Sequence, residues 1–309
     1  MADRIMLNGA VLRNVPALAV CAAILFWASA YPLVRMALVY VPPVPLASLR
    51  YAVAGLIVLG WFCIRRPVIP QWRDMPRFLL CGAVGIALYN ILFNTGEQTV
   101  SAGATSLLIN FAPFMSAFVA VVFLGETLPF WGWVGSIISF TGIVLIGSGQ
   151  PGGFAFGSGA MDVLAAAFCS ALYFLLQRPL VARYGALAST AWILLIGAAV
   201  LLPWLPKGIM ALHAQGPWPW ILAFLLGLFP AVLGYAAWAH VVGQMGVARS
   251  SGFLYLLAPT TLLLAYVMTG EVPTLKTLLG GCVVMSGVVL MQTYGRPRPI
   301  VVTLPDGQS

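Results

Sequence analysis

Long apolar segments constrain this chain more than any other feature of its sequence. They follow one another along most of the 309 residues, and only 7% of the residues are charged, against about 25% in a soluble domain. A bilayer-spanning helix needs about 20 mostly apolar residues, and in lipid only helices and closed barrels satisfy every backbone polar group. The segments are too long and too continuously apolar for barrel strands. The sequence therefore predicts an all-α integral membrane protein.

Ten transmembrane helices fit the apolar segments, with short loops between them and no room for a sizeable soluble domain. A Gly-rich linker at 148–160 separates five spans from five, so we divide the chain into residues 1–150 and residues 151–309. The predicted spans are 16–38, 44–64, 77–97, 102–123 and 127–148 in the first part, and 158–182, 186–205, 217–242, 247–268 and 272–293 in the second.

The first apolar segment also resembles a secretory signal, because Arg4 and Arg13 precede it and Ala28-Ser29-Ala30 is typical of a cleavage site. The segment continues past that site to about Leu38, so we interpret it as a transmembrane helix. The five cysteines lie in apolar segments without a CxxC pair, which is typical of buried small side chains. The sequence predicts no metal site and no cofactor.

Positive charge predicts the orientation, because cytoplasmic loops of membrane proteins are enriched in lysine and arginine. Three basic residues lie toward one side of the ten-span arrangement, namely Arg35, Lys207 and Lys276. Eleven lie on the other side: Arg4, Arg13, Arg65, Arg66, Arg73, Arg77, Arg178, Arg183, Arg249, Arg296 and Arg298. Both termini are therefore predicted to be cytoplasmic, in a bacterial-type inner membrane. This asymmetry accounts for the net charge of +8, so no nucleic-acid partner is predicted.

An internal repeat relates the two parts of the chain. Ala112-Pro113 matches Ala258-Pro259 at an offset of 146, and Gly125-Glu126 matches Gly270-Glu271 at 145. Further matches at 145 to 147 pair Tyr89 with Tyr235, Gly135 with Gly280, and Pro32-Leu33-Val34 with Pro179-Leu180-Val181. Because five spans is an odd number, the second repeat enters the membrane in the opposite orientation. Inverted repeats of this kind are typical of transporters that bind their substrate near the midplane.

These motifs resemble a known family. The stretch 101–108 followed by Ala112-Pro113 and Leu124-Gly125-Glu126, and its second copy at Ala248, Ala258-Pro259 and Gly270-Glu271, are similar to the EamA repeat of the drug/metabolite transporter superfamily. The resemblance covers about 16–293. It implies ten spans, cytoplasmic ends and a cavity lined mainly by spans 1, 3, 4, 6, 8 and 9. It also implies export of amino acids and related metabolites, as in the YddG-type exporters, although other members of the superfamily carry other solutes.

Polar side chains on one face of the third span are the first candidates for the substrate site. Asn90, Asn94 and Glu97 are spaced at i, i+4 and i+7, with Tyr89 adjacent, so they share a helical face. This face is expected to line a cavity, although asparagines also form hydrogen bonds between membrane helices. Glu97 lies near the outer end, where solvation would explain it. The matched face of the eighth span carries Tyr235 and Trp238, and His240 near the inner end is interpreted as interfacial.

Aromatic and amide side chains in other spans complete the candidate set. Two pairs of side chains are four residues apart, Trp27 with Tyr31 and Tyr173 with Gln177. Each pair serves either helix packing or contact with a ligand. Asn110 and Tyr255 are further candidates near the middle of their helices.

Two prolines, two acids and one arginine have structural alternatives. Pro113 and Pro259 occupy matched positions and would each remove a helical hydrogen bond, so they are candidate hinges or static kinks. Glu126 and Glu271 follow glycines at matched span starts, where they are expected to cap helix amides. Arg50 lies inside the second span. It either extends toward the membrane surface, which is the preferred interpretation, or binds a substrate carboxylate.

The sequence thus predicts a transporter that exports small organic metabolites, most plausibly amino acids, by alternating access. Transport is expected to be facilitative, because the acidic residues lie at helix ends rather than at membrane depth. The alternatives are a carrier of another solute class, such as a drug, nucleoside or sugar derivative, and an intramembrane enzyme. An enzyme is poorly supported, because no acidic pair lies mid-span and the two histidines are far apart. The substrate, the coupling ion and the oligomeric state stay open.

Overall fold

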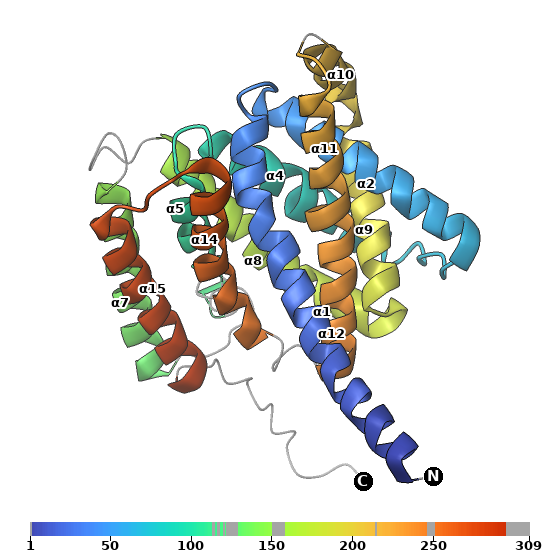
Figure 1. Cartoon of the computed structure of the whole chain (residues 1–309), viewed down its shortest axis with the longest axis horizontal. Helices are drawn as coiled ribbons and strands as arrows, with labels where there is room; N and C mark the ends of the chain where they lie inside the picture. Colours follow the sequence, from blue (N-terminus) through green and yellow to red (C-terminus); the bar gives the residue numbers. More distant parts are fainter. Residues whose placement is uncertain are drawn as a thin grey trace, which may run out of the picture.

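The computed structural model is a bundle of helices (Figure 1). It describes residues 2–112, 129–149, 158–213, 215–245 and 251–294, together with positions 115, 118, 119 and 121. Every regular element within these residues is helical and none is a strand. The predicted all-α membrane class is confirmed at this level.

Six helical stretches are long and apolar enough to cross a bilayer: Ala17–Ala37, Pro43–Arg65, Met75–Gly96, Gly159–Tyr184, Ala186–His213 and Trp218–Val241. Three shorter apolar helices lie at Phe130–Ile146, Leu257–Thr269 and Leu275–Met291. The α-helices of the described residues are α1 (Ala2–Ala37), α2 (Pro43–Arg65), α3 (Met75–Leu80), α4 (Tyr89–Gly96), α5 (Ala102–Ile109), α7 (Phe130–Ser148), α8 (Ser158–Tyr184), α9 (Ala186–Leu201), α10 (Leu205–His213), α11 (Trp218–Leu228), α12 (Tyr235–Met245), α14 (Leu257–Thr269) and α15 (Leu275–Tyr294).

Two of the spans contain a π-helical segment, which the sequence did not predict. The segment η1 (Cys81–Leu88) joins α3 to α4, and η3 (Phe229–Gly234) joins α11 to α12. Each ends immediately before one of the matched tyrosines, Tyr89 and Tyr235. π-helical turns are rare and occur frequently at functional sites, so these matched positions mark the region around the two tyrosines.

The ninth predicted span changes helix type along its length. A 3₁₀ segment, η4 (Ser251–Leu256), precedes α14, and Pro259 is the third residue of α14. The prediction that Pro259 lies in the middle of a helix is therefore wrong. Its missing N–H falls in the first helical turn, where proline is well tolerated. The matched Pro113, the second candidate hinge, lies outside the described residues, as does Glu126.

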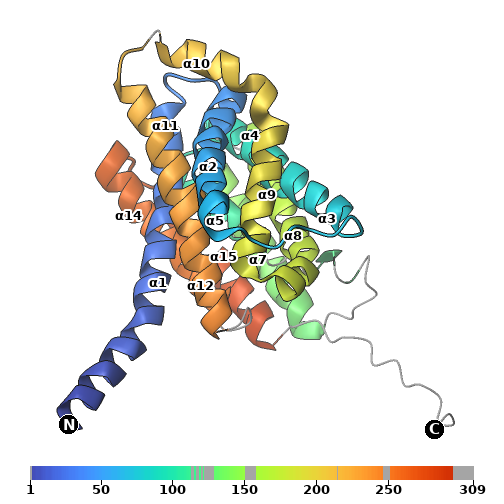
Figure 2. The same ribbon diagram turned by 90° about the vertical axis from the view of Figure 1, so that its right-hand side faces the viewer.

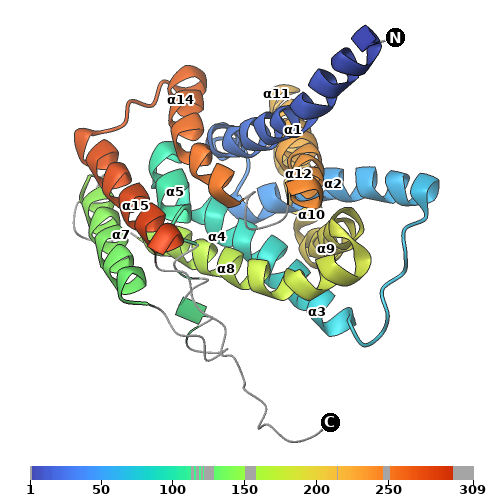
Figure 3. The same cartoon turned by 90° about the horizontal axis from the view of Figure 1, so that it is seen from below.

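Helices α7 and α15 pack directly against each other (Figures 1 and 3). A Cβ atom on Gly287 would lie 2.5 Å from the main-chain oxygen of Gly135, and one on Gly142 would lie 2.7 Å from that of Gly280. The helices therefore run antiparallel with their backbones in contact, as small residues permit in membranes. Gly135 matches Gly280 and Gly142 matches Gly287 at an offset of 145. Exchanging matched residues thus turns one of these contacts into the other.

The remaining helices enclose a core around α1, α2 and α4 (Figure 2). Helix α4 packs on α8, α2 packs on α9 and α11, and α1 packs on α12 and α14. Helix α10 (Leu205–His213) lies across one end of the bundle in Figure 2. The core therefore contains segments from both halves of the chain, and it surrounds the polar residues of α2 and α4.

Ion pairs connect the two halves at opposite ends of α2, which is about 34 Å long at 1.5 Å per residue. Near its start, Arg35 Nε lies 3.5 Å from Glu271 Oε1. Beyond its far end, Asp74 accepts hydrogen bonds of 2.6 Å from Tyr184 Oη and Arg183 Nη1. The hydrogen bond from Tyr184, which has the larger effect, and the one from Arg183 hold the pKa of the Asp74 carboxyl below its usual value. Each end of the bundle thus has an ionic contact between the halves.

Glu271 caps a helix, although not the one that the sequence indicated. Its Oε2 atom accepts a hydrogen bond of 3.0 Å from the main-chain N–H of Ala102, the first residue of α5. Glu271 therefore joins the start of α5 in the first half to the loop before α15 in the second half. Its carboxylate stabilises the free amide there.

Candidate functional site

Asn90 lies at the centre of a buried hydrogen-bond network between α4 and α2. Its Oδ1 accepts a hydrogen bond of 3.0 Å from Arg50 Nη1. Its Nδ2 donates to Tyr51 Oη at 3.0 Å and to the main-chain oxygen of Ile86 at 2.7 Å. The Asn90 side chain is fully buried. Burial of an amide is tolerated because these bonds satisfy it, and they fix its orientation toward Arg50.

Arg50 does not extend to the membrane surface. Its residue exposure is 6%, so the preferred interpretation from sequence is wrong. The guanidinium carbon lies 5.4 Å from the centroid of the Tyr51 ring, close enough for a cation–π contact. The Nε atom is buried and has no hydrogen-bond partner among the described residues. A buried charge is costly unless it is paired and hydrogen-bonded. The Arg50 guanidinium has no anionic partner among the described residues.

Aromatic side chains from α1 and α12 form one wall beside this network. The Trp27 ring lies 5.3 Å from that of Tyr235 in an edge-to-face arrangement and 5.4 Å from that of Trp238. These separations are typical of favourable aromatic pairs. Tyr235 also packs against the buried apolar cluster that contains Tyr51. The sequence-predicted residues of spans 1 and 8 therefore do meet.

A second aromatic group, from α1 and α4, adjoins the same network. The Tyr31 ring lies 5.1 Å from Phe93, and Tyr89 stacks on Phe93 at 5.8 Å. Tyr31 and Tyr89 belong to one apolar cluster with Phe93, and Tyr89 directly precedes Asn90 in the chain. From α8, buried Tyr173 belongs to the same apolar cluster as Tyr51. We call the joint set the central cluster: Trp27, Tyr31, Arg50, Tyr51, Tyr89, Asn90, Phe93, Tyr173, Tyr235 and Trp238.

Four of the predicted site residues do not join the central cluster through described contacts. Asn94 donates to the main-chain oxygen of Pro43 at 2.9 Å, which fits hydrogen bonding between helices, although its Oδ1 is unsatisfied. Asn110 donates to Ser106 in its own helix at 2.8 Å. Gln177 is half-buried and forms no hydrogen bond with a described residue. The side chain of Tyr255 lies outside the described part of the structure.

Glu97 differs most from its sequence-based interpretation, because it is fully buried rather than solvated. Neither carboxylate oxygen has a hydrogen-bond partner among the described residues. Arg35 Nη1 donates to the main-chain oxygen of Glu97 and not to its carboxylate. Glu97 is therefore a second buried ionisable group without a direct ionic partner among the described residues, two helical turns beyond Asn90.

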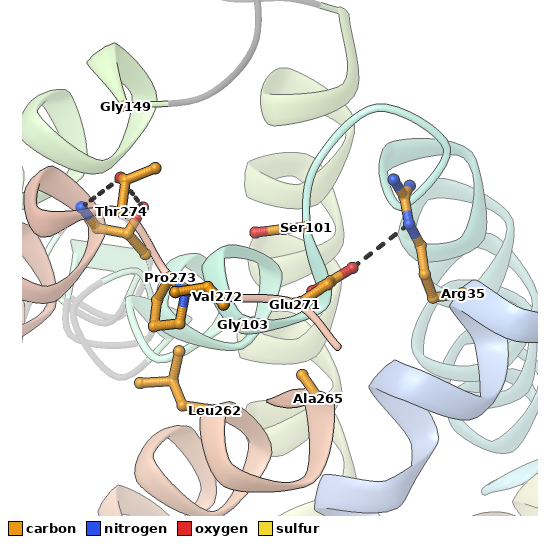
Figure 4. Close-up of a pocket in the computed structure, with 11 residues that line it drawn as sticks. Arg35, Ser101, Gly103, Gly149, Leu262, Ala265, Glu271, Val272, Pro273 and Thr274 are labelled. Atoms are coloured by element: carbon orange, nitrogen blue, oxygen red, sulfur yellow. Dashed lines mark hydrogen bonds and ion pairs between the residues drawn. The ribbon is translucent and has the colours of Figure 1, made fainter. Parts of the chain in front are cut away.

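Two described cavities lie toward opposite ends of the bundle. One of about 210 Å³ is lined by residues that include Arg35, Ser101 and Glu271, and Figure 4 shows the Arg35–Glu271 ion pair beside it. The other, of about 300 Å³, lies between α9 and α12 and includes exposed His240. Neither cavity includes Asn90 or Asn94. These two cavities therefore lie outside the Asn90 network.

Sequence reasoning missed Tyr51 and Phe93, and it undervalued Arg50 and Glu97. Tyr51 and Phe93 carry no signal that separates them from other aromatic residues in apolar segments. Arg50 did carry one, because a charged residue inside a membrane span is a functional-site candidate by default. Among the described residues, no group of three His, Cys, Asp or Glu side chains is arranged to hold a metal ion.

Membrane-length helices around a buried polar and aromatic centre define a multi-pass membrane protein of the kind that moves solutes across bilayers. The chain belongs to the EamA-like transporter family, whose model matches residues 14–148 and 157–293. The resemblance that the sequence motifs indicated is thereby confirmed. The family and the named relatives are transporters, which points away from an enzyme.

Relatives match nearly the whole chain. The "Probable terminal-alkyne amino-acid exporter" of Streptantibioticus cattleyicolor is 37% identical over 278 residues, which are 88% of this chain and 92% of that protein. The uncharacterised transporter YdfC of Bacillus subtilis is 36% identical over 266 residues, which are 85% and 86% of the two chains. A solved crystal structure with 20% identity has a TM-score of 0.58 and covers 89% of this chain and 95% of its own. The last likeness supports the fold.

Proposed function

We propose that this protein exports amino acids or closely related small metabolites across a bacterial inner membrane. The observation that carries the proposal is the transporter-family match over both halves, together with the relative at 37% identity that is named as an amino-acid exporter. The central cluster supports it, because buried Arg50 offers a positive group to a carboxylate and the surrounding rings offer an apolar and aromatic environment. Another relative is named an inner membrane transporter, in Escherichia coli.

The proposed mechanism is alternating access by two inverted five-span repeats, residues 1–150 and 151–309, with ten spans in all. The symmetric glycine contacts between α7 and α15 support this arrangement, as do the π-helical segments before Tyr89 and Tyr235. In an inverted repeat, exchanging the conformations of the two halves converts an opening on one face into an opening on the other. The Arg35–Glu271 and Asp74–Arg183 pairs would then separate alternately.

Pro113 and Pro259 are retained as candidate hinges of this motion. Pro259 lies beside the junction of η4 with α14, where the helix already changes its hydrogen-bond pattern. A rotation there breaks fewer α-helical bonds than one in the middle of a regular helix. Pro113 is included only because it occupies the position in the first repeat that matches Pro259 in the second.

Solute flux into proteoliposomes tests the proposed function. A panel of amino acids, nucleosides, sugar derivatives and cationic drugs should show flux for amino acids at least tenfold above that for protein-free vesicles. Flux confined to another solute class would replace the proposal by a carrier of that class. Chemical conversion of a solute by the purified protein, without flux, would favour an intramembrane enzyme.

The same vesicles test the prediction that transport is facilitative. Facilitative transport needs no movement of ions, so a solute gradient alone should support flux. The prediction relied on solvation of Glu97, and the structure buries that residue, so Glu97 is the residue to examine. Flux that requires a pH gradient in the parent protein, and loses that requirement in Glu97→Gln, would overturn facilitative transport and assign proton exchange to Glu97.

Cysteine labelling tests the topology. In a cysteine-free variant, a single cysteine at position 154 should react with a membrane-impermeant reagent from the outside, and one at position 70 from the cytoplasm. The physical reason is the excess of basic residues on the predicted cytoplasmic side. Labelling of position 154 only from the cytoplasm would contradict the ten-span arrangement.

A further inference from the structure

The strongest unexplained feature of the structure is a pair of buried ionisable side chains, one basic and one acidic, that lack direct ionic partners among the described residues. Arg50 is 6% exposed and Glu97 is fully buried. The two described ion pairs are Arg35–Glu271 and Arg183–Asp74, so neither Arg50 nor Glu97 belongs to one among the described residues. Two uncompensated charges in one protein interior are costly.

The two charges face the same region of the core. Arg50 Nη1 is held by Asn90 of α4, and Glu97 follows the end of α4 seven residues later. Seven residues of α-helix span about 10 Å along the axis, which sets the scale of their separation. Tyr31 and Tyr89 both pack on Phe93, which lies between Asn90 and Glu97 on α4. These rings therefore adjoin the stretch of α4 that separates Asn90, the partner of Arg50, from Glu97.

We propose that Arg50 and Glu97 bind the two ends of a zwitterionic α-amino acid, Arg50 its carboxylate and Glu97 its ammonium group. This assignment rests on the proposed function and specifies the chemistry of its site. An α-amino acid that forms charge-assisted hydrogen bonds at both ends spans about 8 Å from the guanidinium nitrogen to the carboxylate oxygen. That length is comparable with the rise of about 10 Å along α4 between Asn90, which holds Arg50, and Glu97. The guanidinium Nε and both Glu97 oxygens are free to form these bonds.

Other charged groups near Glu97 do not already supply its partner. Arg35 is engaged by the Glu271 carboxylate and by the main-chain oxygen of Glu97. Glu271 is itself negative, and it accepts from Arg35 and from Ala102. An ammonium group would therefore complete a site that the described side chains leave incomplete. The rings of Tyr31, Phe93 and Tyr235 favour an apolar or aromatic side chain on the amino acid.

Binding by the purified full-length protein tests the proposal with three matched probes. The probes are phenylalanine, phenethylamine, which lacks the carboxylate, and 3-phenylpropanoate, which lacks the ammonium group; leucine and its two analogues form a second set. The parent protein should bind each amino acid about tenfold or more tightly than either analogue, because each analogue loses one charge-assisted contact.

The variants should change these preferences in opposite ways. Arg50→Gln should bind phenylalanine and phenethylamine with affinities within about twofold, while it still disfavours 3-phenylpropanoate. Glu97→Gln should lose the discrimination against 3-phenylpropanoate and keep that against phenethylamine. A general packing defect would weaken all three probes together. Arg50→Lys and Glu97→Asp keep the charges and should restore both preferences in part; they replace the glutamine variants if those do not fold.

The outcomes separate this inference from the proposed function. If the parent protein binds the amino acids but the variants keep both preferences, the Arg50–Glu97 assignment is overturned while amino-acid export stands. If the parent binds neither phenylalanine nor leucine, the assignment is also overturned. If, in addition, the vesicles transport no amino acid, the proposed function falls with it.

Discussion

Replacing Asn90 with aspartate should lower amino-acid flux at least tenfold while the protein stays folded. Asn90 Oδ1 now accepts from Arg50 Nη1 at 3.0 Å, and a carboxylate there would give Arg50 the negative partner that it lacks. A substrate carboxylate would then have to displace an intramolecular ion pair, so we expect affinity and flux to fall at least tenfold, equivalent to about 1.4 kcal/mol. Thermal stability should hold or rise. Vesicle flux and thermal unfolding in detergent measure the two effects on the same sample.

Asn90→Ala and a control on the same helix complete this test. Alanine removes the bonds to Arg50 and Tyr51 without supplying a charge, so flux should fall by about 10- to 100-fold and stability should fall as well. Among the described residues, the Thr95 hydroxyl donates to the main-chain oxygen of Ile91 in its own helix and to no other group, so Thr95→Ala should leave flux near the parental value. If both Asn90 variants kept the parental flux, Asn90 and Arg50 would serve helix packing and not substrate binding.

Replacing Gly287 with leucine should prevent stable folding. A Cβ atom at position 287 would lie 2.4 Å from Ser139 Oγ, 2.5 Å from Gly135 O and 2.6 Å from Ser139 N. Two of these atoms belong to the α7 backbone, so α7 and α15 must separate to accept any side chain. Overpacking of a well-packed interface costs about 1–3 kcal/mol, and Gly287→Ala should already lower the unfolding temperature. Leucine should remove the monodisperse peak in size-exclusion chromatography.

Gly60 provides the matched control for this prediction. It lies in α2, and a Cβ atom there would meet nothing within 4 Å. Gly60→Ala should therefore leave the unfolding temperature equal to that of the parent or raise it, because alanine favours helix by about 0.5–1 kcal/mol relative to glycine. An unfolding temperature of Gly287→Ala that matches the parent would show that α7 and α15 can move apart at little cost.

Much of the architecture could be read from the sequence because lipid leaves few solutions for an apolar chain. The helical class followed from run length and low charge, and the family followed from two copies of one motif. Residues that meet through the fold were identified in part. Trp27, Tyr235 and Trp238 were expected on cavity-facing spans, and they do pack together.

Apart from the position of Pro259, the errors have a common physical origin, because the partner of a polar group cannot be read from one helix. Arg50 was expected at the surface because its side chain is long enough to reach it, but Asn90 on another helix holds it inside. Glu97 was expected in water because it lies near a helix end, yet other segments cover that end. Glu271 was expected to cap the helix that follows it and instead caps α5. Each error concerns a contact across helices.

The π-helical segments before Tyr89 and Tyr235 have a consequence for how this chain can accept insertions and deletions. A π-turn holds one residue more than an α-turn, so losing one residue from 81–88 could be absorbed by conversion to regular α-helix. A loss within a regular α-helix would instead turn every following side chain by about 100° around the helix axis, given 3.6 residues per turn. The π-helical segment before Asn90 therefore provides a place where one residue can be lost while Asn90 stays directed at Arg50. The segment before Tyr235 offers the second half of the chain the same tolerance.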